Sequence, residues 1–212
     1  MQEPPFVVFA MPRSRSAWLS SFLTYGDWQC AHEELRHVRS LADVQSWLSM
    51  PRTGTVETAA APFWRLLRQF RPDARVLVVM RPAAEVVESF LKLDLRGEGS
   101  FDRSQLIRMT RRLEAKLWQI AERWPGARIC RFEDLNDEET CREVFEFCLP
   151  YAHDHEWFSR VSTVNVQCSM PALMRYERAY RAQLVLANAK AKQAILQGFH
   201  RWRSRSRLEL AL

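Results

Sequence analysis

The chain has only five cysteines and no C-x-x-C pair among them. An odd, scattered set of cysteines argues against a disulfide framework and against a zinc site built from cysteines. The histidine, aspartate and glutamate residues also show no metal-ligand spacing. We therefore expect no bound metal, a reducing cytoplasmic environment, and free thiols at Cys30, Cys130, Cys141, Cys148 and Cys168.

The sequence also lacks a long apolar run. Its longest stretch without a charged residue, 161–174, contains serine, threonine, asparagine and glutamine. It falls short of the ~20 apolar residues that a membrane-spanning helix needs. Near the N-terminus, Glu3 stands where a signal peptide would be basic, and the following apolar run ends at Pro12. We expect neither a signal peptide nor contact with a membrane.

Positive charge is concentrated at one end of the chain. The 212 residues carry a formal net charge of +6, with 47% apolar and 26% charged residues, as is usual for a globular protein. Residues 175–212 contain nine Lys or Arg and two Glu, so their net charge is +7, and that of residues 1–174 is −1. We expect a domain over 1–174 and a helical basic extension over 175–212. An anionic partner such as nucleic acid is an alternative to a merely solvated basic extension.

Short apolar segments alternate with amphipathic patterns over the first 150 residues. The strand candidates at 6–10 and 75–80 are nearly continuous apolar runs, which is typical of strands covered on both faces. Further strands are expected at 29–32, 54–57 and 127–132, and helices at 16–25, 41–49, 60–71, 83–94, 102–124 and 137–149, the last with Asn136 and Glu139 as its cap. This order predicts an α/β three-layer sandwich with a central, mainly parallel sheet of about five strands. Ligands of such folds bind beyond the carboxyl ends of the strands.

The first strand candidate runs into a short turn, Pro12–Ser16, and then into a helix. Such a turn directs unpaired backbone N–H groups and the positive end of the helix at one point, which suits an anion. Arg13 and Arg15 add positive charge, and the hydroxyls of Ser14 and Ser16 can donate hydrogen bonds. The alternative is that one serine merely caps the helix and both arginines are solvated. The turn is not a Walker A loop, because G-x-x-x-x-G-K-[ST] is absent.

Residues 12–19, PRSRSAWL, resemble the 5′-phosphosulfate loop of sulfotransferases, P-[KR]-[ST]-G-[ST]-T-x-[LM]. Arg15 replaces the usual glycine, so its backbone has to tolerate the loop conformation, and Ala17 replaces the usual threonine. The resemblance implies a P-loop NTPase-like fold. It also implies that the loop binds 3′-phosphoadenosine-5′-phosphosulfate (PAPS) through Arg13, Ser14, Arg15, Ser16 and Ala17. Trp18 is a candidate to flank the adenine, with core packing as the alternative.

Two further segments carry the same resemblance. Residues 75–92, RVLVVMRPAAEVVESFLK, are similar to the family's 3′-phosphate motif, because Arg81 and Ser89 keep its eight-residue spacing. Residues 129–135, ICRFEDL, resemble a segment that follows a later strand of the family. The three motifs span residues 6–148 in the family's order. The pattern is most similar to the branch that contains tyrosylprotein and bacterial carbohydrate sulfotransferases.

The resemblance implies transfer of a sulfuryl group from PAPS to a hydroxyl or amine, without a metal. Arg13 would stabilise charge on the leaving phosphate. In the similar branch a glutamate about twenty residues after the loop is the general base, and Glu33 lies 21 residues after Pro12. The alternative bases are Glu34, His32 and His37.

The acceptor has no motif of its own in this sequence. Glu57 and Thr58 follow a strand candidate and are placed to contact an acceptor at the edge of the site, or to cap a helix. The acceptor class stays open between a small molecule, a carbohydrate and a peptide. Two alternative functions are a kinase-like transferase that uses ATP and Mg²⁺, and a non-catalytic module that binds an anion or nucleic acid through a degenerate loop.

Overall fold

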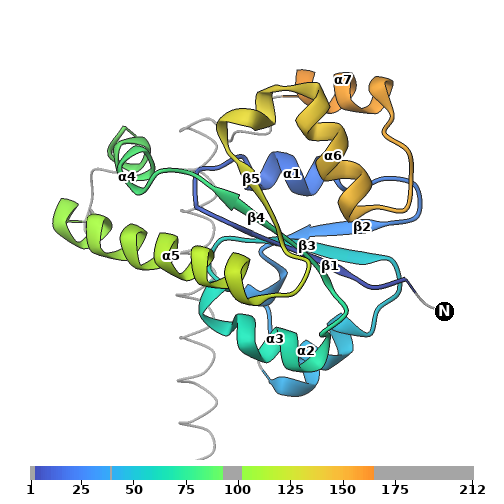
Figure 1. Cartoon of the computed structure of the whole chain (residues 1–212), viewed down its shortest axis with the longest axis horizontal. Coiled ribbons are helices and arrows are strands. Elements are labelled where there is room, and N and C mark those ends of the chain that lie inside the picture. The colour runs from blue at the N-terminus through green and yellow to red at the C-terminus, as the bar shows by residue number, and fades with distance from the viewer. Residues whose placement is uncertain (1–2, 39, 93–101, 165–212) are drawn as a thin grey trace, which may run out of the picture. The chain divides into compact units, whose positions relative to one another are not determined.

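Five parallel strands form one sheet in the order β2-β3-β1-β4-β5 (Figure 1). The computed structural model describes residues 3–38, 40–92 and 102–164. The strands are β1 (Phe6–Ala10), β2 (Gln29–His32), β3 (Thr53–Glu57), β4 (Arg75–Met80) and β5 (Arg128–Arg131). These bounds lie within one residue of the predicted ones, and the predicted α/β fold with its parallel sheet is confirmed.

The chain divides into two compact units, Met1–Gln167 and Cys168–Leu212. The second unit lies outside the described residues, as do the expected domain boundary at 174 and the basic extension over 175–212. Among the described residues, no helix is both long enough and apolar enough to cross a membrane.

Helices cover both faces of the sheet (Figure 1). One face packs against α1 (Ser16–Phe22), α6 (Glu138–Cys148) and α7 (His155–Thr163), and the other against α2 (Leu41–Leu48), α3 (Trp64–Phe70), α4 (Ala83–Leu91) and α5 (Arg103–Arg123). Because side chains alternate along a strand, Phe6 and Val8 of β1 enter the first core, and Val7 and Phe9 enter the second. The three layers are those that the sequence predicts.

The central strand β1 is buried along its whole length. It pairs with β3 through Phe6 and Gly54, and with β4 through Phe6 and Arg75. Gly54 is required by close packing, because a Cβ atom at this position would lie 2.1 Å from the ring of Phe6. The sheet is therefore tightly packed where β1 begins, at the end of the strand opposite to the loop that follows it.

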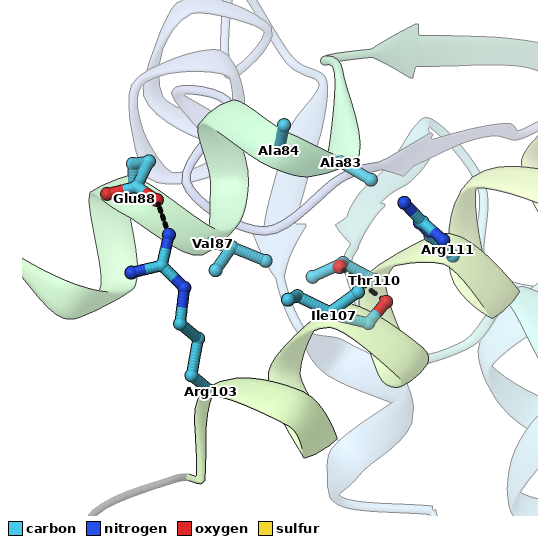
Figure 2. Close-up of a pocket in the computed structure, with 8 residues that line it drawn as sticks. All are labelled: Ala83, Ala84, Val87, Glu88, Arg103, Ile107, Thr110 and Arg111. Atoms are coloured by element: carbon cyan, nitrogen blue, oxygen red, sulfur yellow. Dashed lines mark hydrogen bonds and ion pairs between the residues drawn. The ribbon is translucent and has the colours of Figure 1, made fainter.

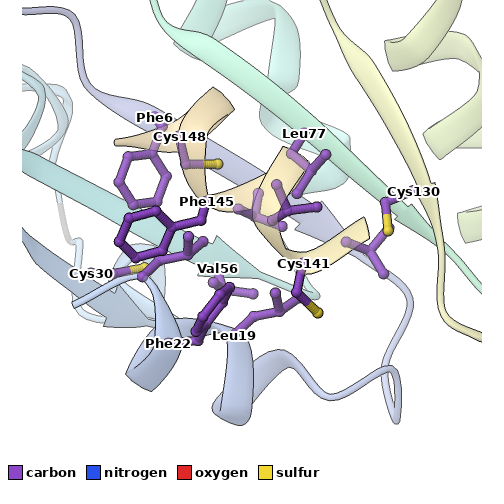
Figure 3. Packing of buried hydrophobic residues seen from close by; sticks show 14 of the residues in the cluster. Phe6, Leu19, Phe22, Cys30, Val56, Leu77, Cys130, Cys141, Phe145 and Cys148 are labelled. Carbon is purple, nitrogen blue, oxygen red and sulfur yellow. The ribbon is translucent and has the colours of Figure 1, made fainter. Parts of the chain in front are cut away.

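Four thiols lie in the core between the sheet and α6: Cys141 and Cys148 on the helix, Cys30 on β2 and Cys130 on β5 (Figure 3). Burial raises the pKa of Cys130, Cys141 and Cys148 to about 12, and raises that of Cys30 well above its ordinary value. All four are free, as the sequence indicates, and they pack as small apolar side chains.

Three local features differ from the sequence-based expectation. The cap of α6 is Asp137, whose carboxylate accepts the N–H of Thr140 at 2.9 Å, rather than Asn136. Asn136 instead ends a 3₁₀ helix. Within the described part of the chain, three such helices follow strands of the sheet: η1 (Glu34–Arg36), η2 (Ala61–Phe63) and η3 (Glu133–Asn136). The predicted helix over 60–71 thus begins as η2. Helix α7 has no counterpart among the predicted elements.

Candidate functional site

The loop between β1 and α1 has an unusual backbone. Arg13 has φ 64° and Arg15 has φ 61°, whereas Ser14 between them has no positive φ. Alternation of left-handed and ordinary residues turns successive N–H groups toward one concave side, which is a known arrangement for binding anions. Each left-handed non-glycine residue costs roughly 1–2 kcal/mol, so the surrounding contacts have to hold this loop in place.

The N–H groups at the start of α1 precede the first helical hydrogen bond. Leu19 donates the first helical hydrogen bond, to the carbonyl oxygen of Arg15 at 2.8 Å. Over the described ranges, the N–H groups of residues 14–18 donate to no protein atom. Such groups form hydrogen bonds with water or with an anion. The backbone of the loop thus leaves these N–H groups without a protein acceptor in the described residues, and the binding of an anion there stays a prediction.

The two serine hydroxyls of the loop have separate partners. Ser14 is fully buried and its hydroxyl donates to the carbonyl oxygen of Met11, so it braces the turn from within. Ser16 lies at the surface of the loop, and its Oγ is 3.0 Å from Nε2 of His32. The structure thus brings His32, one of the alternative bases, next to the loop.

The side chain of Arg15 leaves the loop instead of filling it. Its Nη1 donates to the carbonyl oxygen of Leu135 in η3 at 2.8 Å, and its guanidinium lies 5.5 Å from the ring centre of Trp18. The backbone of Arg15 adopts the left-handed conformation that glycine favours. Arginine can therefore replace the glycine without closing the concave side of the loop.

Trp18 belongs to the core. It is 8% exposed, and its ring stacks on Phe22 with 4.9 Å between the ring centres. Phe158 meets it edge-on at 6.4 Å, and Arg15 covers it from the loop side. This placement supports the packing role that the sequence left open for Trp18. Ala17, next to it, contributes its carbonyl oxygen to the hydroxyls of Ser20 and Ser21.

The two arginine-bearing motifs meet at the carboxyl ends of β1 and β4. Arg13 Nε donates to Oγ of Ser89 in α4 at 3.2 Å, and Arg81 Nη1 donates to the carbonyl oxygen of Arg13. The guanidinium of Arg81 also lies 4.1 Å from the ring centre of Phe132, which holds it in place. Segments 76 and 68 residues apart in the sequence thus form one cluster.

The positive charge of this cluster is only lightly neutralised. Within the residues that the structure describes, Arg13 forms no ion pair. Arg81 pairs with Glu85 one turn into α4 at 3.4 Å, and that carboxylate is half exposed to solvent. Such an exposed i,i+4 pair is weak. An anion with several negative charges can therefore compete for both arginines.

Two glutamates lie at the neighbouring carboxyl ends of β2 and β3. Glu33 follows β2 with φ 60°, and its N–H donates to the carbonyl oxygen of Val56 at 2.9 Å. Its Oε1 accepts the N–H of Thr58 at 3.0 Å and the hydroxyl of Thr58. Glu33 is 7% exposed, so the predicted base is a buried, hydrogen-bonded carboxylate. Glu34 and His37 lie in and directly after η1, further from the loop in sequence.

Glu57 is the more deeply buried of the two acids. Its Oε1 accepts the hydroxyl of Thr55 at 2.6 Å and the N–H of Leu35 at 3.0 Å, whereas its buried Oε2 has no partner. Burial, with help from the carboxylates of Glu33 and Glu34, raises the pKa of Glu57 to about 7. The sequence placed Glu57 at the edge of the site but contained no signal for its link to Leu35.

A separate cavity of about 130 Å³ lies between α4 and α5 (Figure 2). Val87 and Ile107 form its apolar floor, and an ion pair of 2.5 Å between Glu88 and Arg103 lies at one end. None of the predicted site residues lines it. In the described part of the chain, no cluster of His, Cys, Asp or Glu side chains has the arrangement needed to hold a metal ion.

Solved structures share this arrangement of strands and helices. Mouse sulfotransferase SULT7A1, solved as a complex with PAP, aligns over 81% of this chain and 70% of its own, with a TM-score of 0.58 and 9% sequence identity. The fold is sulfotransferase-like. Two further matches to this sulfotransferase-like fold are weaker: the sulfotransferase domain from the curacin biosynthetic pathway (80% of each chain, 14% identity, TM-score 0.48) and sulfotransferase STF9 from Mycobacterium avium (76% and 67%, 13% identity, TM-score 0.49).

No protein-family model matches the chain, and no curated protein matches it by sequence. The sulfotransferase-like P-loop fold is nevertheless the one that the sequence motifs predict. The strand order 2-3-1-4-5 comes from the structure. The branch within sulfotransferases and the roles of the individual site residues stay predictions.

Proposed function

We propose that the protein is a sulfotransferase that moves a sulfuryl group from PAPS to a hydroxyl or amine acceptor. The observation that carries this proposal is the contact between the two arginine-bearing motifs, with Arg13 Nε 3.2 Å from Ser89 Oγ and Arg81 bonded to the Arg13 carbonyl. An adenosine with phosphates at both its 5′ and 3′ positions has the charge to engage both motifs at once.

In this proposal each group has a distinct task. The open N–H groups of the loop and the guanidinium of Arg13 stabilise negative charge on the departing 5′-phosphate. Arg81 and Ser89 bind the 3′-phosphate, which orients the donor for in-line transfer. Glu33 removes the proton of the acceptor, so that the acceptor oxygen or nitrogen bonds to sulfur as the bond between sulfur and the bridging phosphate oxygen breaks.

The acceptor is proposed by class only. A small molecule, a carbohydrate or a peptide side chain with a hydroxyl or amine fits the reaction. The proposed location is the cytoplasm, and the four buried free thiols agree with a reducing environment. An additional anionic partner for the basic segment over 175–212 concerns residues outside the described part of the chain.

Titration calorimetry with PAP, compared with ATP and Mg²⁺, tests the proposal. We expect the wild-type chain to bind PAP without Mg²⁺ and in preference to ATP. Arg13→Ala and Arg81→Ala should each weaken PAP binding by about 10- to 100-fold, because each removes hydrogen bonds from a charged donor. Arg142→Ala is the matched control: it removes one positive charge from α6, where Arg142 pairs with Glu139.

The control should bind PAP as the wild type does. Equal binding by all three variants would remove the assignment of the arginine cluster to the nucleotide. Binding of ATP with Mg²⁺ in place of PAP would favour the kinase-like alternative.

A further inference from the structure

Glu33 and Glu57 occupy equivalent places on neighbouring parallel strands. His32 pairs with Val56, so each glutamate is the next residue beyond that pair on its own strand. Because parallel strands end at the same edge of the sheet, both side chains lie in one layer at the carboxyl edge. The next strand across is β1, whose Phe9 pairs with Glu57 and which leads into the loop.

Each of the two carboxylates accepts a backbone N–H group from the turn that follows the other glutamate. Glu33 Oε1 accepts the N–H of Thr58, the residue after Glu57, at 3.0 Å. Glu57 Oε1 accepts the N–H of Leu35, two residues after Glu33, at 3.0 Å. The turn that carries Glu33 is therefore tied to β3 on both sides, which explains how a non-glycine residue with φ 60° is held there.

The remaining oxygens of the two acids differ. Glu57 is 1% exposed and its Oε2 is buried without a partner, so this carboxyl cannot reach a substrate. In the described chain, Oε2 of Glu33 accepts no hydrogen bond, and unlike Oε2 of Glu57 it is not fully buried. One acid thus has an oxygen left for chemistry, and the other is used entirely within the fold.

We propose that Glu57 is a positioning residue, which fixes the orientation of Glu33 by holding the N–H of Leu35. This inference rests on the proposed function, in which Glu33 is the base. Glu57 contacts neither donor nor acceptor, and it acts only through the turn over 33–35.

The charge of Glu57 depends on pH, which gives a second way to test its positioning role. The titratable groups that interact with it are the carboxylates of Glu33 and Glu34 and the thiol of Cys30. With a pKa of about 7, Glu57 changes its charge within the working range of most enzymes. Its ionisation places a second negative charge beside the carboxylate of Glu33, so the charge in this layer of the site changes with pH.

The test compares Glu57→Gln, which keeps an acceptor oxygen, with Glu57→Leu, which has a similar volume and no acceptor. Amide hydrogen exchange measured by NMR should be at least tenfold faster at Leu35 in Glu57→Leu than in Glu57→Gln. The amide of Met11, bonded to the Val79 carbonyl in the centre of the sheet, is the control for global unfolding and should not change.

Turnover with PAPS and a panel of phenol, sugar and tyrosine-peptide acceptors supplies the second readout. In Glu57→Leu, kcat should fall at least tenfold with KM for PAPS within twofold, and Glu57→Gln should restore most of kcat. The wild-type rate should show an inflection near pH 7 that Glu57→Gln lacks. PAP binding with unchanged kcat in Glu57→Leu overturns this inference alone, whereas failure of the wild type to bind PAP overturns the proposed function and this inference with it.

Discussion

At the ends of β1 and β4 the site is built from arginines, whereas at the ends of β2 and β3 it is built from glutamates. The arginines bond to one another's motif, and toward the residues that the structure describes Arg13 donates from Nε alone and Arg81 pairs with the exposed Glu85. Both glutamates are buried. Oε1 of Glu57 accepts two hydrogen bonds from the protein, and its Oε2 is buried without a partner.

The difference follows from the cost of burying charge. A guanidinium has five N–H donors and a long stem, so it can brace a loop and still present donors to a ligand. A buried carboxylate needs donors of its own, and here backbone N–H groups of the adjacent turn supply them. The arginine half therefore keeps positive charge at the edge of the sheet, and the glutamate half holds the backbone of the adjacent turns.

The largest expected effect tests whether the glutamate half takes part in chemistry. Glu33→Gln keeps an acceptor for Thr58 but cannot take a proton, so turnover should fall by about 10²- to 10⁴-fold. Binding of PAP should stay within twofold, because the nucleotide is assigned to the arginine half. Steady-state kinetics and calorimetry on the same preparation measure both quantities.

Wild-type turnover by Glu33→Gln would show that Glu33 is not the base, and that the glutamate half of the site does not supply the proton acceptor. The same assay on Glu34→Gln, His32→Ala and His37→Ala would then identify the base. His32 is the strongest rival, because its Nε2 already lies 3.0 Å from Ser16 in the loop.

A smaller effect concerns stability rather than rate, and it arises from Glu57. The folded pKa of about 7 exceeds the ordinary value of 4.5, so between these values the folded state holds a proton that the unfolded state releases. Stability from this group is complete below about pH 4.5 and is lost as pH rises to about 7, by about 3 kcal/mol. Urea unfolding of wild type and Glu57→Gln across this range measures the difference, since the variant should lack this slope. Parallel curves would mean that Glu57 is ionised in the fold without penalty.

The smallest effect tests the strain in the arginine half. Arg15→Gly and Arg15→Ala both lose the bond to Leu135, but only glycine adopts φ 61° freely. The glycine variant should therefore be more stable than the alanine variant by about 1 kcal/mol. Thermal or urea unfolding of the pair isolates the backbone contribution. Equal stability would show that the loop relaxes once the arginine is removed.

Much of the fold could be predicted because its signals are local. The continuous apolar runs at 6–10 and 75–80 became the buried strands β1 and β4, and the stripe over 102–124 became α5. Helix α7 was missed although the sequence carries signals for it: Asp154 is a favourable cap residue, and Trp157, Phe158 and Val161 are spaced to face the core together. The cap of α6 was misplaced by one residue because Asn136 and Asp137 are both favourable cap residues.

The site was predictable where it follows from strand order and not where it depends on side-chain packing. Parallel strands bring Arg13 and Arg81 to the same edge, and the eight-residue spacing places Ser89 within reach of them. The bond from Leu35 to Glu57 depends instead on how a 3₁₀ turn settles beside a strand, and neither residue type signals it. The left-handed backbone of Glu33 carries no sequence mark either, because glutamate rarely adopts it.

The thiols in the core between the sheet and α6 have low intrinsic reactivity. With a pKa of about 12, Cys130, Cys141 and Cys148 carry almost no thiolate near neutrality, and thiolate is the form that alkylating agents and peroxides attack. We therefore expect covalent modification at these positions to require an opening of the layer that covers them.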